Sequence, residues 1–159
     1  MKKINFEKTK ILKESSKKID ESLFDINKQI SLINKIYLEE DDTFKSILLR
    51  ELDQKINSYK HQDIEKSLEI DNLITTQQLI EKLVASKLRC YYCKHQILLL
   101  YKHQREDYQW SLDRINNSKG HSSENTLISC LKCNLQRRCQ ISEAFKFTKQ
   151  LKINKINKI

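Results

Sequence analysis

The sequence contains no proline and only one glycine, Gly120, among its 159 residues. Sandwiches and barrels need many tight turns, which depend on both residue types, so a mostly-β fold is not expected and long helices are. Apolar residues never run together for the roughly 18 positions of a transmembrane helix. The N-terminal stretch has scattered charges and lacks the apolar core of a secretory signal. We therefore expect an intracellular protein, in the cytoplasm or nucleus, that has no membrane partner.

Acidic residues are scarce in the second part of the chain, and the whole net charge of +9 lies there. Residues 1–88 contain 16 Lys/Arg and 16 Asp/Glu, whereas residues 89–159 contain 14 Lys/Arg and only 5 Asp/Glu. The second part also holds all five cysteines and three of the four histidines. This asymmetry predicts two functional parts, of which the second binds a polyanion. The alternative is a solvated basic surface that binds nothing.

The first 88 residues are expected to be mainly helical. Apolar side chains between residues 12 and 38 follow a heptad spacing, which keeps one stripe facing a partner helix: Leu12, Ile19, Leu23, Ile26, Ile30, Ile33 and Tyr37. After an acidic turn at residues 39–42, a second stripe recurs at gaps of three or four: Phe44, Leu48, Leu52, Ile56 and Tyr59. The two stripes predict an antiparallel hairpin of helices about 27 residues long. It would form a coiled-coil homodimer, act as a DNA-spanning arm, or pack on a third helix.

A third, shorter helix is expected before the first cysteine. Thr75, followed by Gln78, has the form of a capping box, which satisfies unpaired N–H groups at a helix start. Apolar residues in the next two turns then provide a buried face. We expect this helix to end near Ser86.

In the second part of the chain the apolar period changes to that of strands. Residues 95–101 are mainly apolar and residues 108–115 alternate, so together they predict a β-hairpin. The following loop contains Gly120, for which a positive φ is expected. A helix then begins near residues 123–125 or just after Cys130.

Four of the five cysteines form two C-x-x-C pairs, Cys90 with Cys93 and Cys130 with Cys133. Each pair can place two thiolates on one tetrahedral ion, so two pairs complete a closed site of four thiolates. Zinc suits soft thiolates in this geometry, and a closed site has a structural role. The fifth, Cys139, is expected to be a small buried residue.

The stretch from Cys90 to Arg138 contains CYYC and then WSLDRINNSKGHSSENTLISCLKCNLQRR. This combines an Asp at the end of a strand, a glycine loop, an Asn and a final C-x-x-C-N. In this combination the stretch resembles an HNH endonuclease of the ββα-metal class, similar to those encoded by large DNA viruses and phages. The expected fold is therefore α+β, with a helical hairpin region (1–88), a small zinc-stapled ββα module (89–140) and a basic tail (141–159).

The resemblance implies hydrolysis of DNA phosphodiester bonds with one divalent ion. Asp113 matches the strand carboxylate and Asn134 matches the helix amide that together hold this ion. Such hard oxygen ligands suit Mg²⁺ or Mn²⁺. Asn125 matches the central Asn, which orients the catalytic base. Three basic residues lie near Asn134 and would contact phosphates: Lys132, Arg137 and Arg138.

Arg114 departs from the family pattern, because the family has its water-activating histidine at this position. A guanidinium stays protonated, so Arg114 would hold the phosphate, and another residue must act as the base. His121 in the loop is the first candidate and His103 the second. Asn116 stands where related sequences have Asp. The sequence predicts an HNH-type metal-dependent DNA endonuclease; the alternative is a non-catalytic, zinc-containing DNA-binding protein.

Overall fold

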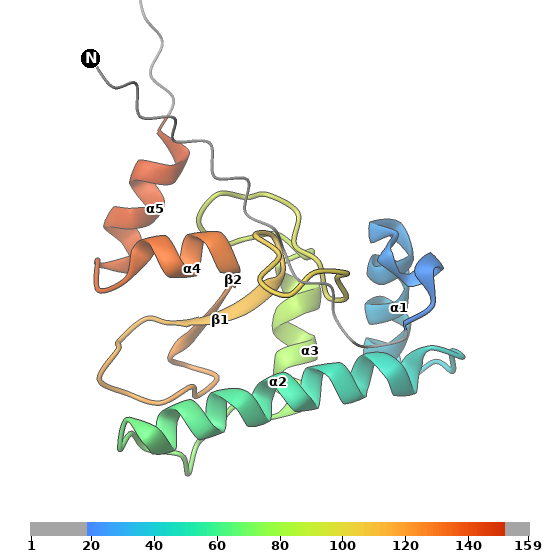
Figure 1. Cartoon of the computed structure of the whole chain (residues 1–159), viewed down its shortest axis with the longest axis horizontal. Helices are drawn as coiled ribbons and strands as arrows, with labels where there is room; N and C mark the ends of the chain where they lie inside the picture. The colour runs from blue at the N-terminus through green and yellow to red at the C-terminus, as the bar shows by residue number, and fades with distance from the viewer. Residues whose placement is uncertain (1–18, 152–159) are drawn as a thin grey trace, which may run out of the picture.

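The computed structural model describes residues 19–151, so Leu12 and the end of the basic tail lie outside the described residues. Within this range the chain is α+β, as expected, with helices around one two-stranded sheet (Figure 1). The elements in chain order are η1 (Glu21–Phe24), α1 (Ile26–Tyr37), α2 (Lys45–Glu65), α3 (Thr76–Ala85), β1 (Trp110–Arg114), β2 (Thr126–Cys130), α4 (Leu131–Arg137) and α5 (Ser142–Gln150). None of the helices in this range has the length and apolar character needed to cross a membrane.

The first helix is shorter than the sequence predicted, and it does not lie along the second. α1 has 12 residues, because the carboxylate of Asp25 caps its start by accepting from the N–H of Lys28 at 2.9 Å. α1 packs against α3, and in Figure 1 it stands at a steep angle to the 21-residue α2. The expected antiparallel hairpin is therefore wrong in both helix length and pairing.

The buried face of α1 differs from the predicted heptad stripe because it includes a glutamine, Gln29. α1 buries Gln29 with its apolar neighbours, whereas Tyr37 of the stripe is 44% exposed. The side-chain oxygen of Gln29 accepts from the N–H groups of Leu99 and Leu100 at 2.7 and 3.2 Å. Its amide nitrogen donates to the carbonyl oxygens of Leu23 and Leu100 at 2.8 and 2.9 Å. α1 is thus tied to the second part of the chain, and the coiled-coil homodimer stays a prediction.

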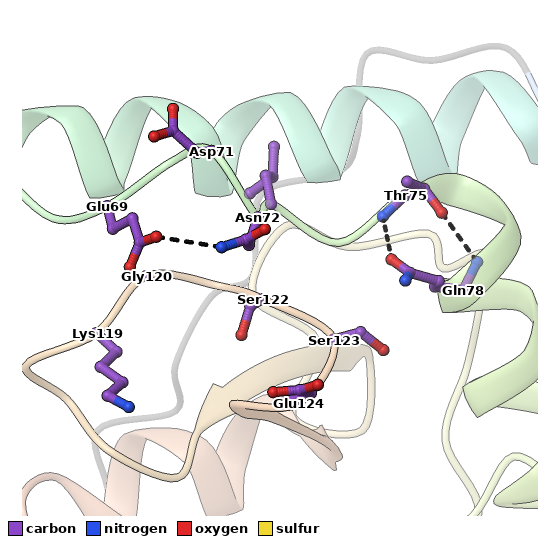
Figure 2. Close-up of a pocket in the computed structure, with 11 residues that line it drawn as sticks. Glu69, Asp71, Asn72, Thr75, Gln78, Lys119, Gly120, Ser122, Ser123 and Glu124 are labelled. Carbon is purple, nitrogen blue, oxygen red and sulfur yellow. Dashed lines mark hydrogen bonds between the residues drawn. The ribbon is translucent and has the colours of Figure 1, made fainter.

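The second and third helices follow the sequence pattern closely. α2 buries the expected apolar stripe, and its next buried position is an acidic residue, Asp63. α3 has the expected capping box, in which the Thr75 hydroxyl accepts from the Gln78 N–H at 3.2 Å (Figure 2). The Gln78 side chain in turn accepts from the Thr75 N–H at 3.0 Å. The helix ends at Ala85, with Ser86 as its C-cap.

The sheet uses a different pair of strands from the one predicted. β1 lies in the expected place, but its antiparallel partner is β2, in register from Trp110 opposite Cys130 to Arg114 opposite Thr126. Residues 95–101 form no strand, because their backbone groups bond irregularly to neighbouring loops and to Gln29. The helix start near residues 123–125 is wrong as well, and the alternative just after Cys130 is confirmed by α4.

One hydrophobic core joins the two parts of the chain. It contains Leu52 of α2 and Leu83 of α3 together with Trp110 and Leu112 of β1. The basic tail contributes α5, whose Phe145 is 5% exposed. The parts expected on either side of residue 88 therefore pack as one body around the sheet.

Candidate functional site

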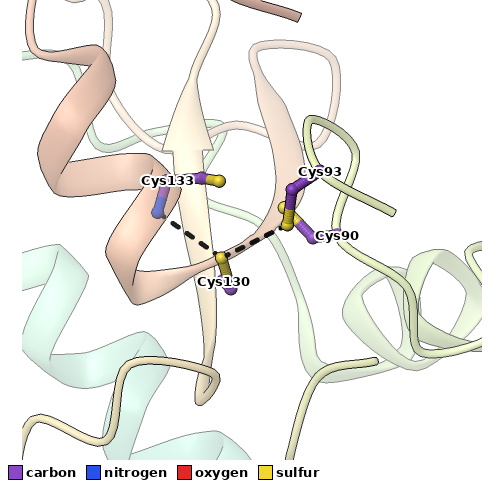
Figure 3. Close-up of side chains that lie close together, drawn as sticks. All are labelled: Cys90, Cys93, Cys130 and Cys133. Atoms are coloured by element: carbon purple, nitrogen blue, oxygen red, sulfur yellow. Dashed lines mark hydrogen bonds between the residues drawn. The ribbon is translucent and has the colours of Figure 1, made fainter. Parts of the chain in front are cut away.

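The four paired cysteines come together at one end of the sheet (Figure 3). Cys90 and Cys93 lie in the loop after α3, Cys130 ends β2, and Cys133 lies in the first turn of α4. Their four Sγ atoms all lie within 4.8 Å of one another. A tetrahedral zinc with bonds of about 2.3 Å needs sulfur atoms about 3.8 Å apart, and the Sγ atoms of Cys93 and Cys130 are 3.9 Å apart. The cluster can therefore hold a metal ion.

The electrostatics of the cluster favour a bound cation. Hydrogen bonds shared with Cys130 and Cys90, together with burial, raise the pKa of the Cys133 thiol. Thiolates packed so closely repel one another, and a divalent cation removes that penalty. The N–H of Cys133 also points at the Sγ of Cys130, at 3.4 Å. The fifth cysteine, Cys139, is exposed and lies outside the cluster, so the expectation that it is buried is wrong.

A separate cleft of about 560 Å³ lies between α2 on one side and β1 and α4 on the other. Six of the residues expected from the sequence line it: Asp113, Arg114, His121, Asn134, Arg137 and Arg138. α2 and the residue after it add two lysines, Lys55 and Lys66. Five basic side chains and one acidic side chain thus line the cleft, and its charge is strongly positive.

Three residues of α2 contact the module formed by residues 89–140. Lys55, Tyr59 and Asp63 recur every four positions, so they share one face of the helix. Lys55 donates to the carbonyl oxygen of Trp110 and stands 4.3 Å from the centre of its ring. The Tyr59 hydroxyl accepts from the N–H of Leu112 at 3.0 Å. The cleft therefore exists only because the helical part is docked on the sheet.

Asp113 is buried and both of its carboxylate oxygens are occupied. Arg137 donates from Nε to Oδ2 at 2.6 Å and from Nη2 to Oδ1 at 2.8 Å. The hydroxyl of Tyr92 donates to Oδ2 at 2.5 Å. Burial, and then this bond to Asp113, raise the pKa of Tyr92, which keeps the hydroxyl protonated as a donor. The structure thus places Asp113 in a buried ion pair rather than at an open ligand position.

The expected divalent-ion site therefore does not fit the residues as they are arranged. An ion on Asp113 would have to displace the guanidinium of Arg137 from the same two oxygens. Asn134 donates from Nδ2 to the carbonyl oxygen of Leu112 at 3.1 Å, which leaves only its neutral Oδ1 as a ligand atom. One amide oxygen beside a cluster of basic residues does not make a site for a hard cation.

Of the three expected phosphate contacts, one is buried in an ion pair at the cleft wall, one lies outside the cleft, and one is exposed at the cleft. Arg137 is 2% exposed and bonds to Asp113 and to the carbonyl oxygen of Arg114, so it does not face solvent. Lys132 lies outside the cleft, 3.8 Å from Asp107. Arg138 is exposed and lines the cleft.

The loop between β1 and β2 is held in shape by Asn125. Its Oδ1 accepts from the N–H of Asn116 at 2.9 Å, and its Nδ2 donates to the carbonyl oxygen of Gly120 at 2.9 Å. No positive φ occurs at Gly120; a side chain is excluded there because a Cβ would lie 2.0 Å from the carbonyl oxygen of Glu69. Asn125 thus shapes the loop that carries His121, rather than bonding to the histidine itself.

His121 lies at the wall of the cleft next to α2. Its Nδ1 is 2.8 Å from Oδ1 of Asp63, and its backbone N–H donates to Oδ2 of the same carboxylate at 2.7 Å. Arg114 approaches Asp63 as well, at 3.6 Å. Burial lowers the pKa of His121, although Asp63 acts in the opposite direction. His103, the second candidate base, does not line the cleft.

The other face of the same loop borders a second pocket of about 500 Å³ (Figure 2). This pocket has an acidic lining, with Glu69, Asp71 and Glu124, and it contains none of the expected site residues. No protein-family model, curated protein or solved structure matches this chain. A functional assignment therefore depends on the residues of the cysteine cluster and of the cleft.

The part of the site that sequence reasoning missed is Asp63. The signal was present, because Asp63 follows Tyr59 at the next position of the apolar stripe of α2. An acidic residue on a buried helix face needs a partner, since burying an unpaired charge is costly. Ile64, the next apolar residue after Tyr59, is 51% exposed.

Proposed function

We propose that the protein is an HNH-type endonuclease that holds zinc in the cysteine cluster, binds DNA in the cationic cleft and hydrolyses a phosphodiester bond there. The observation that carries the proposal is the meeting of Arg114, His121 and Asn134 in one positively charged cleft beside a strand–strand–helix unit. These residues come from three separate elements of the module. The order of strand, strand and helix, with one cysteine pair before it and the second at the junction of β2 and α4, agrees with the family pattern.

DNA binding is supported by the charge of the cleft and by the exposure of its edge. Lys66 and Arg138 are exposed, and Arg114 lines the same cleft, 3.6 Å from the buried Asp63. Each neutralised phosphate releases counterions, so affinity should fall steeply with salt. Arg114 is the group best placed to hold a phosphate beside His121, because its guanidinium can donate to two oxygens at once.

In this proposal, side chains of the cleft carry out the hydrolysis of the phosphodiester bond. Mg²⁺ or Mn²⁺ is what the resemblance implies, but Asp113 offers no open oxygen, so no step is assigned to a metal ion. Arg114 would stabilise negative charge that develops on the phosphate in the transition state. A base in the cleft would take a proton from the attacking water.

The second candidate is a zinc-containing DNA-binding protein that does not cut. The pairing of Asp113 with Arg137 favours it, since it closes the position where the family holds its ion. The presence of Arg114 at the usual histidine position favours it as well. Both candidates require DNA in the same cleft.

One set of assays separates the candidates. The full chain, loaded with zinc, is incubated with supercoiled plasmid in Mg²⁺, Mn²⁺ or EDTA, and its affinity for a short duplex is measured at several salt concentrations. Cleavage that is lost in Asn134→Ala supports the endonuclease, because that side chain lines the cleft. Binding without cleavage under every condition supports the second candidate. Absence of binding at low salt would overturn both.

A matched pair of variants locates the binding surface. Arg138→Ala removes an exposed charge at the cleft and should lower affinity several-fold, with a salt slope smaller by about one. Lys28→Ala removes an exposed charge on α1, outside the cleft, and should leave both quantities unchanged. Equal losses in the two variants would argue against the cleft.

A further inference from the structure

His121 is held by a carboxylate from the other part of the chain. Asp63 is fully buried near the end of α2, and its two oxygens contact the Nδ1 and the backbone N–H of His121 at 2.8 and 2.7 Å. The ring of Tyr59, one turn earlier on α2, lies 4.6 Å from the imidazole between ring centres. The position and the rotation of the imidazole are therefore both fixed.

This arrangement selects one tautomer of the histidine. An ionised carboxylate only accepts hydrogen bonds, so Nδ1 carries the proton and Nε2 keeps its lone pair. Among residues 19–151, the only fully buried side-chain polar atom without a partner is Nδ1 of His103, so Nε2 of His121, to which no hydrogen bond is found, is not fully buried. Since His121 also lines the cleft, the cleft is the side from which Nε2 would be reached.

Burial, assisted by two nearby cations, keeps the imidazole neutral near pH 7. Burial lowers its pKa below the usual 6.5, Asp63 acts to raise the pKa, and Arg114 and Lys66 act to lower it. A neutral ring with a free Nε2 is the form that can accept a proton. Arg114 stands beside the dyad, 3.6 Å from Oδ1 of Asp63, and lines the same cleft as His121.

We propose that Asp63 is the positioning residue of an Asp63–His121 dyad, whose Nε2 takes the proton from the water that attacks the phosphodiester. The bond from the water oxygen to phosphorus forms, and the bond from phosphorus to the leaving ester oxygen breaks. The leaving oxygen takes a proton from solvent, and His121 returns its proton to solvent. This role depends on the proposed function, and it makes the helical part of the chain a component of the reaction site.

The test measures single-turnover plasmid cleavage by the zinc-loaded full chain as a function of pH. The parent rate should rise with pH as the imidazole loses its proton, and the midpoint of this rise should lie below about pH 6.5. Asp63→Asn should lower the rate about 100-fold or more, the range expected for general-base catalysis. It should also move the rising limb to lower pH, because the carboxylate that raises the pKa of His121 is lost. His121→Gln should remove the limb.

Control variants and a binding assay separate this role from a structural one. Asp71→Asn and His61→Gln change exposed groups outside the cleft and should retain the parent rate and pH profile. DNA binding should be retained in Asp63→Asn and His121→Gln, because both variants keep the basic side chains of the cleft. If the parent cuts but the two dyad variants cut equally well, or keep its pH limb, the dyad is overturned and the endonuclease stands. If the parent does not cut with any metal, the proposed function falls and the base role falls with it.

A measurement on the unaltered protein tests the dyad even if the variants fail to fold. Nitrogen-15 NMR of the imidazole should find the neutral ring of His121 with its proton on Nδ1, titrating below pH 6.5. A neutral ring with its proton on Nε2 would leave no lone pair facing the cleft. That result would overturn the dyad whatever the behaviour of the variants.

Discussion

The cysteine cluster and the cationic cleft are built in opposite ways. The cluster takes all four of its residues from two short motifs within residues 89–140, and each motif brings its two cysteines together within four residues of sequence. The cleft needs Tyr59 and Lys66 from the region of α2 as well as Arg114 and Asn134 from the module. A local site can survive changes in the rest of the fold, whereas a site between two parts depends on their docking.

The largest effect should come from the cysteine cluster. Zinc bound to four thiolates contributes about 10 kcal/mol or more to small metal-stabilised modules, so Cys130→Ser should unfold residues 89–140. The shared core means that the helices should lose stability as well. Elemental analysis should find about one zinc per parent chain, and circular dichroism should report the unfolding. Cys139→Ser, which alters an exposed cysteine outside the cluster, is the matched control and should change neither.

A smaller but still large loss should follow when the buried ion pair next to the cleft is broken. Asp113→Ala leaves the guanidinium of Arg137 buried without its partner, which should cost about 3–5 kcal/mol. Glu21→Gln breaks an exposed pair with Lys102 and should cost less than about 1 kcal/mol. Urea unfolding of the two variants measures both losses. Equal small losses would show that Asp113 is not a structural anchor.

Features built from local contacts could be predicted from the sequence. The cysteine pairs and the capping box at Thr75 were predicted because each is a short motif whose residues contact one another locally. The prediction of a strand at residues 95–101 was wrong because a short apolar run does not reveal where its backbone groups will bond. Gln29 supplies the bonds that a neighbouring strand would have made.

The cleft was harder to predict because its key contacts join distant residues. Arg137 looked like a surface charge, since arginine usually is one, and its partner Asp113 lies 24 residues earlier in the sequence. Asp63 and His121 are separated by 58 residues, and no periodicity connects a helix position to a loop position. Candidate residues could be named from the motif, but which of them would be buried depended on the docking of α2.

A moderate effect is expected where the loop that carries His121 meets the chain after α2. Gly120→Ala would place a Cβ 2.0 Å from the carbonyl oxygen of Glu69, so the backbone must shift. We expect a loss of about 1–3 kcal/mol, the usual cost of overpacking. Ser118→Ala, in the exposed part of the same loop, should cost less than about 0.5 kcal/mol. A thermal melt that gives the same midpoint for both variants would contradict the close approach at Gly120.

The smallest expected effect is the contribution of His121, which packs against α2, to the pH dependence of the unfolding free energy. Because burial lowers the pKa of folded His121 below its unfolded value of 6.5, the unfolded chain takes up this proton first as the pH falls. The contribution of His121 to stability is therefore complete above about pH 6.5 and is lost as the pH falls toward its folded pKa. His121→Gln should flatten the fall in unfolding free energy between about pH 7 and 5, measured by urea titration, while His61→Gln on the exposed face of α2 should follow the parent. If His121→Gln keeps the parent slope, then His121 is not held neutral in the folded protein, because the carboxylate of Asp63, 2.8 Å from Nδ1, offsets the effect of burial on its pKa.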